Sequence, residues 1–206
     1  MEIRINTQSS IKFIDDKIIY FDPFKINDKY NDADIIFITH DHYDHYDLES
    51  INNVIKDDTI VVIPEGINNN FKNVIYVKPN NSYNVLGINF ITTYAYNINK
   101  SYHLKEKGYV GYIIYLDKKY YIMGDTDIVP EIDNIDADYV FIPIGGTYTC
   151  DINEAIDYIE KIKPNEVTPI HYGSIVGDIK LGKDFKERIK DIKVNLFIGG
   201  EENDKF

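Results

Sequence analysis

Three of the chain's five histidines fall within residues 39–45, Thr-His-Asp-His-Tyr-Asp-His, directly after an apolar stretch. That stretch, residues 34–38, is rich in β-branched and aromatic side chains, so it predicts a buried strand that ends where the histidines begin. Imidazole nitrogens and carboxylate oxygens at such close spacing suit zinc and similar divalent ions. The segment therefore predicts a metal-binding loop at a strand end, in preference to a solvated polar loop.

The composition predicts one globular domain over residues 1–206. Hydrophobic residues make up 44% of the chain and aromatic residues 14%, enough for a packed core. The net charge of −12 argues against nucleic acid or an anionic membrane as a partner. It does not exclude a small anionic substrate, because a bound metal reverses the local field, and a small-molecule substrate is the expected partner. With no signal-peptide pattern and no apolar run of about 20 residues, we expect a cytoplasmic location. A homo-oligomer is left open.

The single cysteine, Cys150, excludes an intramolecular disulfide and a cysteine-based zinc knuckle. We expect it to be a small buried apolar residue rather than a nucleophile.

Hydrophobic patterning predicts short strands in close succession, followed by a second half in which strands and helices alternate. Short strands with few helices between them indicate mixed or antiparallel sheet in the first half. Asp151 and Glu154 predict a capped start for the clearest helix. Strands are expected at residues 11–14, 18–21, 34–38, 59–64, 74–77, 88–94, 109–116, 119–123, 139–144, 166–170 and 194–198, and helices from residue 47 and at 153–162 and 183–190.

Four of these strands end directly before a residue that can bind metal: Asp22, the histidine loop, Asp125 and His171. Each of these residues alone has an ordinary structural explanation, such as a turn or a core histidine. Together they supply the ligands that two divalent ions need for partial shells with open positions.

The pattern His40-x-His42-x-Asp44-His45, with Asp22, Gly124-Asp125-Thr126 and His171, resembles the metallo-β-lactamase superfamily. Residues 20–24, 143–147 and 169–173 are similar to the branch of metal-dependent hydrolases that includes L-ascorbate-6-phosphate lactonase. The resemblance covers nearly the whole chain. It implies an α+β fold, a four-layer αββα sandwich with two mixed β-sheets face to face, helices outside and a metal site at one edge.

The resemblance also implies roles for these residues. His40 and His42 would bind a first metal ion, Asp44, His45 and His171 a second, and Asp125 would bridge the two. Asp22 would orient the histidine loop by hydrogen bonds. Zinc is the expected metal and manganese the alternative. A metal-bound hydroxide, oriented by Asp44, would attack a carbonyl, as in a lactone, or a phosphodiester of a small anionic substrate.

One departure from the family pattern concerns the first metal. Asn97 stands where the family usually supplies a histidine, and His103 follows six residues later. His103 is expected as the replacement ligand, as a catalytic or substrate-binding group, or as a loop histidine without a role. If Asn97 itself fills the position, the first site would be weak, because an amide oxygen binds zinc less well than imidazole.

The proton donor to the leaving group is open between His103, Tyr172 and Asp127, although Asp127 is more typical of a helix N-cap or a turn. Thr126 and Tyr172 are expected to support the neighbouring ligands Asp125 and His171, or to act as ligands themselves.

Two other functions remain: a metal-binding protein with reduced or lost hydrolase activity, which the Asn97 substitution favours, and an iron-dependent redox enzyme on the same fold.

Overall fold

The computed structural model describes residues 1–198 and contains two mixed β-sheets. The first sheet has six strands in chain order, β1 to β6. β1, β2 and β3 pair antiparallel, whereas β3, β4, β5 and β6 run parallel. Their bounds are β1 Glu2–Ile5, β2 Ile11–Ile14, β3 Ile18–Phe21, β4 Ile35–Phe37, β5 Ile60–Pro64 and β6 Val74–Val77.

The second sheet has seven strands in the order β13-β12-β11-β10-β9-β8-β7. Strands β7 to β10 pair antiparallel, and β10 to β13 pair parallel. The bounds are β7 Ser82–Val85, β8 Ile88–Tyr94, β9 Val110–Tyr115, β10 Lys119–Ile122, β11 Tyr139–Pro143, β12 Glu166–Ile170 and β13 Lys193–Val194.

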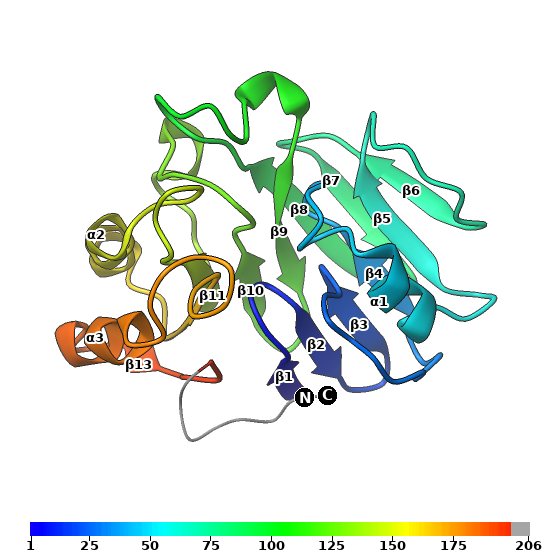
Figure 1. Cartoon of the computed structure of the whole chain (residues 1–206), viewed down its shortest axis with the longest axis horizontal. Coiled ribbons are helices and arrows are strands. Elements are labelled where there is room, and N and C mark those ends of the chain that lie inside the picture. The colour runs from blue at the N-terminus through cyan, green and yellow to red at the C-terminus, as the bar shows by residue number, and fades with distance from the viewer. Residues whose placement is uncertain (199–206) are drawn as a thin grey trace.

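Helices cover the outer face of each sheet, which gives the four layers of an αββα sandwich (Figure 1). Helix α1 (Leu48–Val54) packs on the first sheet, and α2 (Ile152–Ile162) and α3 (Leu181–Arg188) pack on the second. The predicted fold class is therefore confirmed. Two single 3-10 turns, η1 (Lys105–Lys107) and η2 (Pro130–Ile132), lie in the loops.

Alternation of apolar side chains along the strands creates three cores. In β11, Phe141 points into the core between the sheets, while Val140 and Ile142 face the α2 and α3 layer. In β4, Phe37 faces the same central core and Ile36 faces α1. Because both faces of these strands are buried, they are apolar throughout, as parallel strands covered by helices usually are.

The directions of the strands bring the polar strand ends to one edge of the sandwich. β3 and β4 are parallel in the first sheet, and β10, β11 and β12 are parallel in the second. β8 runs with β10, because both pair antiparallel with β9. The carboxyl ends of parallel strands share an edge, so the loops after β3, β4, β8, β10 and β12 can meet there.

The capping box of Asp151 and Glu154 at the start of α2 is confirmed. Four differences from the sequence expectation are small. Strand β1 (Glu2–Ile5) was not among the expected strands. β7 was not predicted, because Ser-Tyr-Asn-Val has little apolar pattern. Helix α3 begins two residues earlier than expected. The expected strand over residues 194–198 is wrong beyond Val194, where the chain leaves the sheet.

Residues 199–206, the end of the predicted domain, lie outside the described part of the chain. Within residues 1–198, no helix combines the length and the apolar character needed to cross a bilayer.

Candidate metal centre

The histidine loop, residues 39–45, leaves β4 and is held from both sides. The backbone carbonyl of Thr39 accepts a hydrogen bond from the amide of Val110 in β9 (3.2 Å). The amides of His45 and Tyr46 both donate to the carbonyl of His42, which closes the loop into a tight turn. Asp47 then caps α1. The loop is therefore a rigid connection between a buried strand and a helix.

His40, His42 and His103 form the first group of possible ligands. One nitrogen from each ring lies within 4.8 Å of the others. The Nε2 atoms of His40 and His103 are 3.2 Å apart. His40 and His103 are buried, while His42 is half-buried beside the pocket.

Asp44, His45 and His171 form the second group, again with ligand atoms within 4.8 Å of one another. Oδ2 of Asp44 lies 3.5 Å from Nε2 of His45 and 3.5 Å from Nε2 of His171. Asp44 comes from the histidine loop of the first sheet and His171 from the end of β12 in the second. The group therefore joins the two sheets.

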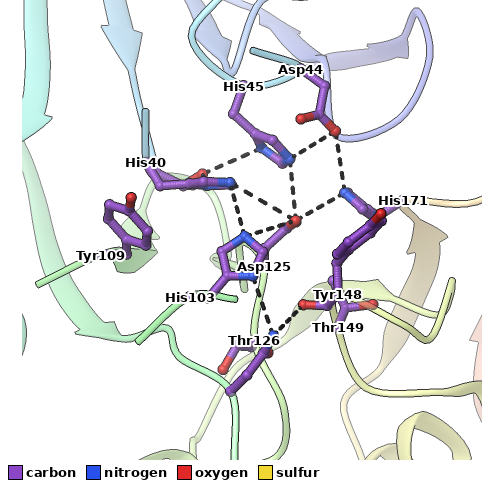
Figure 2. A network of polar contacts seen from close by, with 12 residues as sticks. His40, Asp44, His45, His103, Tyr109, Asp125, Thr126, Tyr148, Thr149 and His171 are labelled. Carbon is purple, nitrogen blue, oxygen red and sulfur yellow. Dashed lines mark hydrogen bonds and ion pairs between the residues drawn. The ribbon is translucent and has the colours of Figure 1, made fainter. Parts of the chain in front are cut away.

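Asp125 lies between the two groups (Figure 2). Its carboxylate oxygens are 3.4 Å from Nε2 of His103, 3.3 Å from Nε2 of His45 and 3.0 Å from Nε2 of His171. Nε2 of His40 is slightly further, at 3.9 Å. A carboxylate in this position can contact cations held by either group, as the expected bridging role requires.

Asp22 fixes the orientation of two of the histidines. Its carboxylate lies 2.7 Å from Nδ1 of His45 and accepts hydrogen bonds from the amide and the hydroxyl of Thr39 (2.8 and 2.6 Å). Because the Thr39 hydroxyl donates to Asp22, its oxygen is free to accept from Nδ1 of His40 at 2.9 Å. Both Nδ1 atoms are thereby engaged, and both Nε2 atoms face the cluster.

Several buried atoms of the cluster need a partner that the chain does not supply. Among residues 1–198, Nε2 of His45, Nε2 of His171 and Oδ1 of Asp125 form no hydrogen bond. Buried polar groups without partners are costly, and a cation is the partner that imidazole and carboxylate lone pairs share. The residues present therefore fit divalent metal ions.

Charge interactions support the same conclusion. Burial lowers the pKa of His103 to about 4 and the pKa of His40 well below its usual range. Burial alone would also lower the pKa of His171, but Asp125 and Asp44 raise it to about 9. Burial would raise the pKa of Asp125, yet His171 and His45 hold it well below the ordinary value. The carboxylates thus stay ionised among neutral and protonated imidazoles, whose protons cations can replace.

The structure places His103, not Asn97, against the first group. Nδ2 of Asn97 donates to the carbonyl of Tyr148 (2.7 Å) and lies 3.3 Å from Nδ1 of His103. The backbone amide of Asn97 also donates to the backbone carbonyl of His103 (2.9 Å). Asn97 therefore braces the loop that brings His103 to His40. Its Oδ1 is buried without a hydrogen-bond partner among residues 1–198, so a role for Asn97 as a ligand stays a prediction.

Two further expectations are corrected. Tyr172 points away from the cluster, because its hydroxyl donates to the carbonyl of Ile198 (2.6 Å) and its ring packs in the α2 and α3 core. Asp127 does not cap a helix: it accepts from the amide of Ile98 (2.8 Å) and pairs with Lys100 (2.5 Å). Neither is placed to donate a proton at the centre.

Thr126 supports the site indirectly. Its hydroxyl accepts from the amide of Tyr96 (3.1 Å) and lies 3.0 Å from the carbonyl of the same residue. It ties the Asp125 strand end to the loop that carries His103, and it is not a ligand.

Sequence reasoning missed Gln8 and Tyr109. Nε2 of Gln8 donates to Oδ2 of Asp44 (3.4 Å), and the Gln8 carbonyl accepts from the amide of His171 (3.1 Å). The Tyr109 hydroxyl donates to Asp41 in the histidine loop (2.5 Å). Nothing in the local sequence marks Gln8, whereas Tyr109 begins the predicted strand over residues 109–116, which adjoins the loop.

Four residues at the centre adopt left-handed backbone, as do other residues elsewhere in the chain. Gln8, Asp22, His103 and His171 all have positive φ, between 43° and 56°. Such a conformation is uncommon outside glycine and costs of order 1 kcal/mol or more, so it persists only where surrounding contacts hold it. Backbone strain of this kind clusters at functional sites.

A pocket of about 400 Å³ opens over the two groups. It is the size of a small-molecule site. It is lined by Asp41, His42, Tyr43, Asp44, Tyr102, His103, Asp125, Tyr148, His171 and Ile175.

Residues 6–171 match the model of the Beta-lactamase superfamily domain. A metal-dependent hydrolase of Nanoarchaeum equitans is 31% identical over 159 residues, which cover 69% of this chain and 71% of the relative. One from Thermoplasma volcanium is 29% identical and covers 77% of each chain. The crystal structure of a metal-dependent hydrolase of Parabacteroides distasonis superimposes with a TM-score of 0.78 at 28% identity, covering 94% of this chain and 91% of that one.

The fold, the clustered ligands at one edge of the sandwich and a domain match over most of the chain agree, and the chain belongs to the metallo-β-lactamase superfamily, among relatives that are metal-dependent hydrolases.

Proposed function

We propose that the protein is a hydrolase that binds two divalent metal ions and cleaves a carbonyl compound, such as a lactone, in the pocket above them. The supporting observation is the convergence of buried Nε2 and carboxylate oxygen atoms without hydrogen-bond partners at the floor of a small-molecule pocket. His40, His42 and His103 would hold one ion, Asp44, His45 and His171 the other, and Asp125 would contact both. Metal ions in such sites lower the pKa of a water molecule and polarise the electrophile.

Asp44 has a second part in this proposal, the orientation of the attacking water. It lies in the pocket wall, and Gln8 holds one of its oxygens. Burial would raise its pKa, but the His171 and His45 rings, each 3.5 Å from its Oδ2, keep that pKa below the ordinary value. An ionised carboxylate at this place can accept a hydrogen bond from water and aim its lone pair at the substrate. His103, facing His40, is proposed as a ligand rather than as the acid.

The lining of the pocket favours a carbonyl substrate over the phosphodiester alternative. Among the described residues that line it, none is lysine or arginine. Sites that bind phosphoryl groups usually supply such cations or the amino end of a helix. Zinc is proposed as the metal on the imidazole-rich ligand set, with manganese as the alternative.

Elemental analysis of purified protein, with and without added metal, tests the proposal. We expect two zinc or manganese ions per chain and turnover of the neutral lactone dihydrocoumarin. Replacing His42 and His45 together with alanine, one residue from each group, should abolish metal binding, and full retention of metal would refute the site. Iron accompanied by oxygen consumption would indicate a redox enzyme. Two bound ions without turnover of any ester, lactone or phosphodiester would indicate a metal-binding protein.

A further inference from the structure

The mouth of the pocket is aromatic. Tyr43 is 67% exposed and Tyr102 is 47% exposed, and both line the pocket. The ring of Tyr148, also in the lining, meets Tyr102 edge to face, with centroids 4.7 Å apart and planes at 86°. Two rings at right angles form a corner that offers one aromatic face and one aromatic edge. Large aromatic surface exposed beside a cavity is typical of a binding site.

The corner lies on loops that also hold the metal centre. Tyr102 directly precedes His103, and the carbonyl of Tyr148 accepts the hydrogen bond of Asn97 (2.7 Å). Tyr148 and His171, both drawn in Figure 2, line the same pocket. A group held at the corner would therefore lie close to a reacting bond placed over Asp125.

The carboxylates that line the pocket would offset most of the charge of bound metal ions. Three carboxylates, of Asp41, Asp44 and Asp125, line it. The charge of two divalent ions with a bound hydroxide would be largely offset by these carboxylates. Without lysine or arginine among the described lining residues, no excess positive charge remains to attract a phosphorylated molecule.

We propose that the substrate is a neutral lactone or ester with a flat aromatic group, which Tyr102 and Tyr148 hold while its carbonyl lies over the metal centre. This inference rests on the proposed hydrolase function. In the reaction the water oxygen bonds to the acyl carbon and the acyl C–O bond breaks. One proton of the water passes to the released alcohol oxygen, which gives a carboxylic acid and an alcohol. The cavity of about 400 Å³ admits a molecule of the size of a bicyclic lactone.

Paired substrates test the aromatic corner. Dihydrocoumarin and δ-valerolactone are both neutral six-membered lactones, and only the first has an aromatic ring. Because their intrinsic reactivities differ, the measured quantity is the change in the ratio of their kcat/KM values on mutation. Tyr102→Leu and Tyr148→Leu should each lower this ratio by about three- to tenfold, chiefly through KM, since an aromatic pair contributes that much. Tyr102→Phe, which keeps the ring, should keep the wild-type ratio of kcat/KM values.

Tyr115→Leu is the matched control. Tyr115 is an exposed tyrosine at the last residue of β9. The first residue of that strand, Val110, is the one that contacts the histidine loop. Its substitution should leave the ratio unchanged, and metal content should be equal in all variants. A ratio that stays constant in both pocket variants would overturn the inference, as would a preference for bis(4-nitrophenyl) phosphate over dihydrocoumarin.

A binding experiment separates this inference from the proposed hydrolase function. The lactam 3,4-dihydroquinolin-2(1H)-one resists hydrolysis. Its binding to the metal-loaded protein can be measured by saturation-transfer NMR and compared with that of δ-valerolactam, which lacks the aromatic ring. Preference for the aromatic lactam without turnover of any lactone would refute the hydrolase and keep the aromatic corner. Turnover of lactones with no preference for the aromatic lactone or the aromatic lactam would refute the aromatic corner and leave the hydrolase function standing.

Discussion

Nε2 of His40 and Nε2 of His103 lie 3.2 Å apart, although 63 residues separate them in the chain. Two ligand nitrogens on one tetrahedral zinc ion are about 3.3 Å apart, given Zn–N distances near 2.0–2.1 Å. Burial holds the pKa of both rings below the usual value, so both lone pairs are available. This separation matches a shared cation, and in the metal-free chain it also allows a hydrogen bond between the two rings.

His103→Ala should therefore remove one of the two metal ions and leave the other. The second group, Asp44, His45 and His171, does not include His103. Elemental analysis after dialysis should fall from two ions per chain to one. Two ions retained at wild-type affinity would show that another residue completes the first group.

Asn97→His should not tighten the first metal. His103 already occupies the position, and the larger ring would lose the hydrogen bond from Nδ2 of Asn97 to the carbonyl of Tyr148. We expect unchanged or weaker zinc affinity in a competition titration with a chelator. An increase of tenfold or more would mean that the loop can present residue 97 to the metal instead.

Asp22→Asn should weaken metal binding without removing a ligand. One amide oxygen cannot accept the three hydrogen bonds that the carboxylate receives from Thr39 and His45. Loss of such supporting bonds typically costs about 10- to 100-fold in affinity. Asp34→Asn is the control. Asp34 precedes the first residue of β4, whereas the histidine loop follows the last, and it pairs with Lys56. Equal metal affinity in both variants would contradict the role of Asp22.

The sequence predicted that Asp22, the histidine loop, Asp125 and His171 come together, because they follow apolar strands and strand direction brings such ends to one edge. It could not decide between Asn97 and His103. That choice depends on how the loop of residues 95–103 folds back, which is fixed by contacts with Thr126 and Tyr148 from distant segments. Gln8 could not be predicted for the same reason. Its hydrogen bonds are with Asp44 and His171, which lie far from it in the sequence.

Gly145→Ala should disturb both stability and the metal centre. A Cβ at Gly145 would lie 2.3 Å from the carbonyl oxygen of His171, which is too close for any contact. The backbone of His171, already left-handed, would have to move. We expect a loss of about 1–3 kcal/mol in the free energy of unfolding, as for other overpacked sites, together with weaker metal binding. Gly66→Ala is the control, because nothing lies within 4 Å of a Cβ there; any cost should come from its positive φ and leave metal affinity unchanged.

Glu166, at the start of β12, should make the fold sensitive to acid. Its carboxylate pairs with Lys118 (2.6 Å) and Lys193 (2.9 Å) and accepts from Nδ2 of Asn195 (2.9 Å). Burial would raise its pKa, but these three partners lower it to about 2. A lowered folded-state pKa means that the unfolded chain takes up the proton first. The stabilisation is therefore complete above the ordinary pKa of 4.5 and is lost as the pH falls toward 2.

Glu166→Gln should reduce the free energy of unfolding at pH 7 by about 1–2 kcal/mol, a figure discounted because the two lysines are largely exposed to solvent. The difference in the free energy of unfolding between wild type and Glu166→Gln should shrink as the pH falls from 4.5 to 3. Urea unfolding of metal-free protein at pH 7, 4 and 3 measures it, and the acid sensitivity of the metal centre cancels in the comparison. A difference that stays constant over this range would mean that the carboxylate keeps an ordinary pKa in the folded protein.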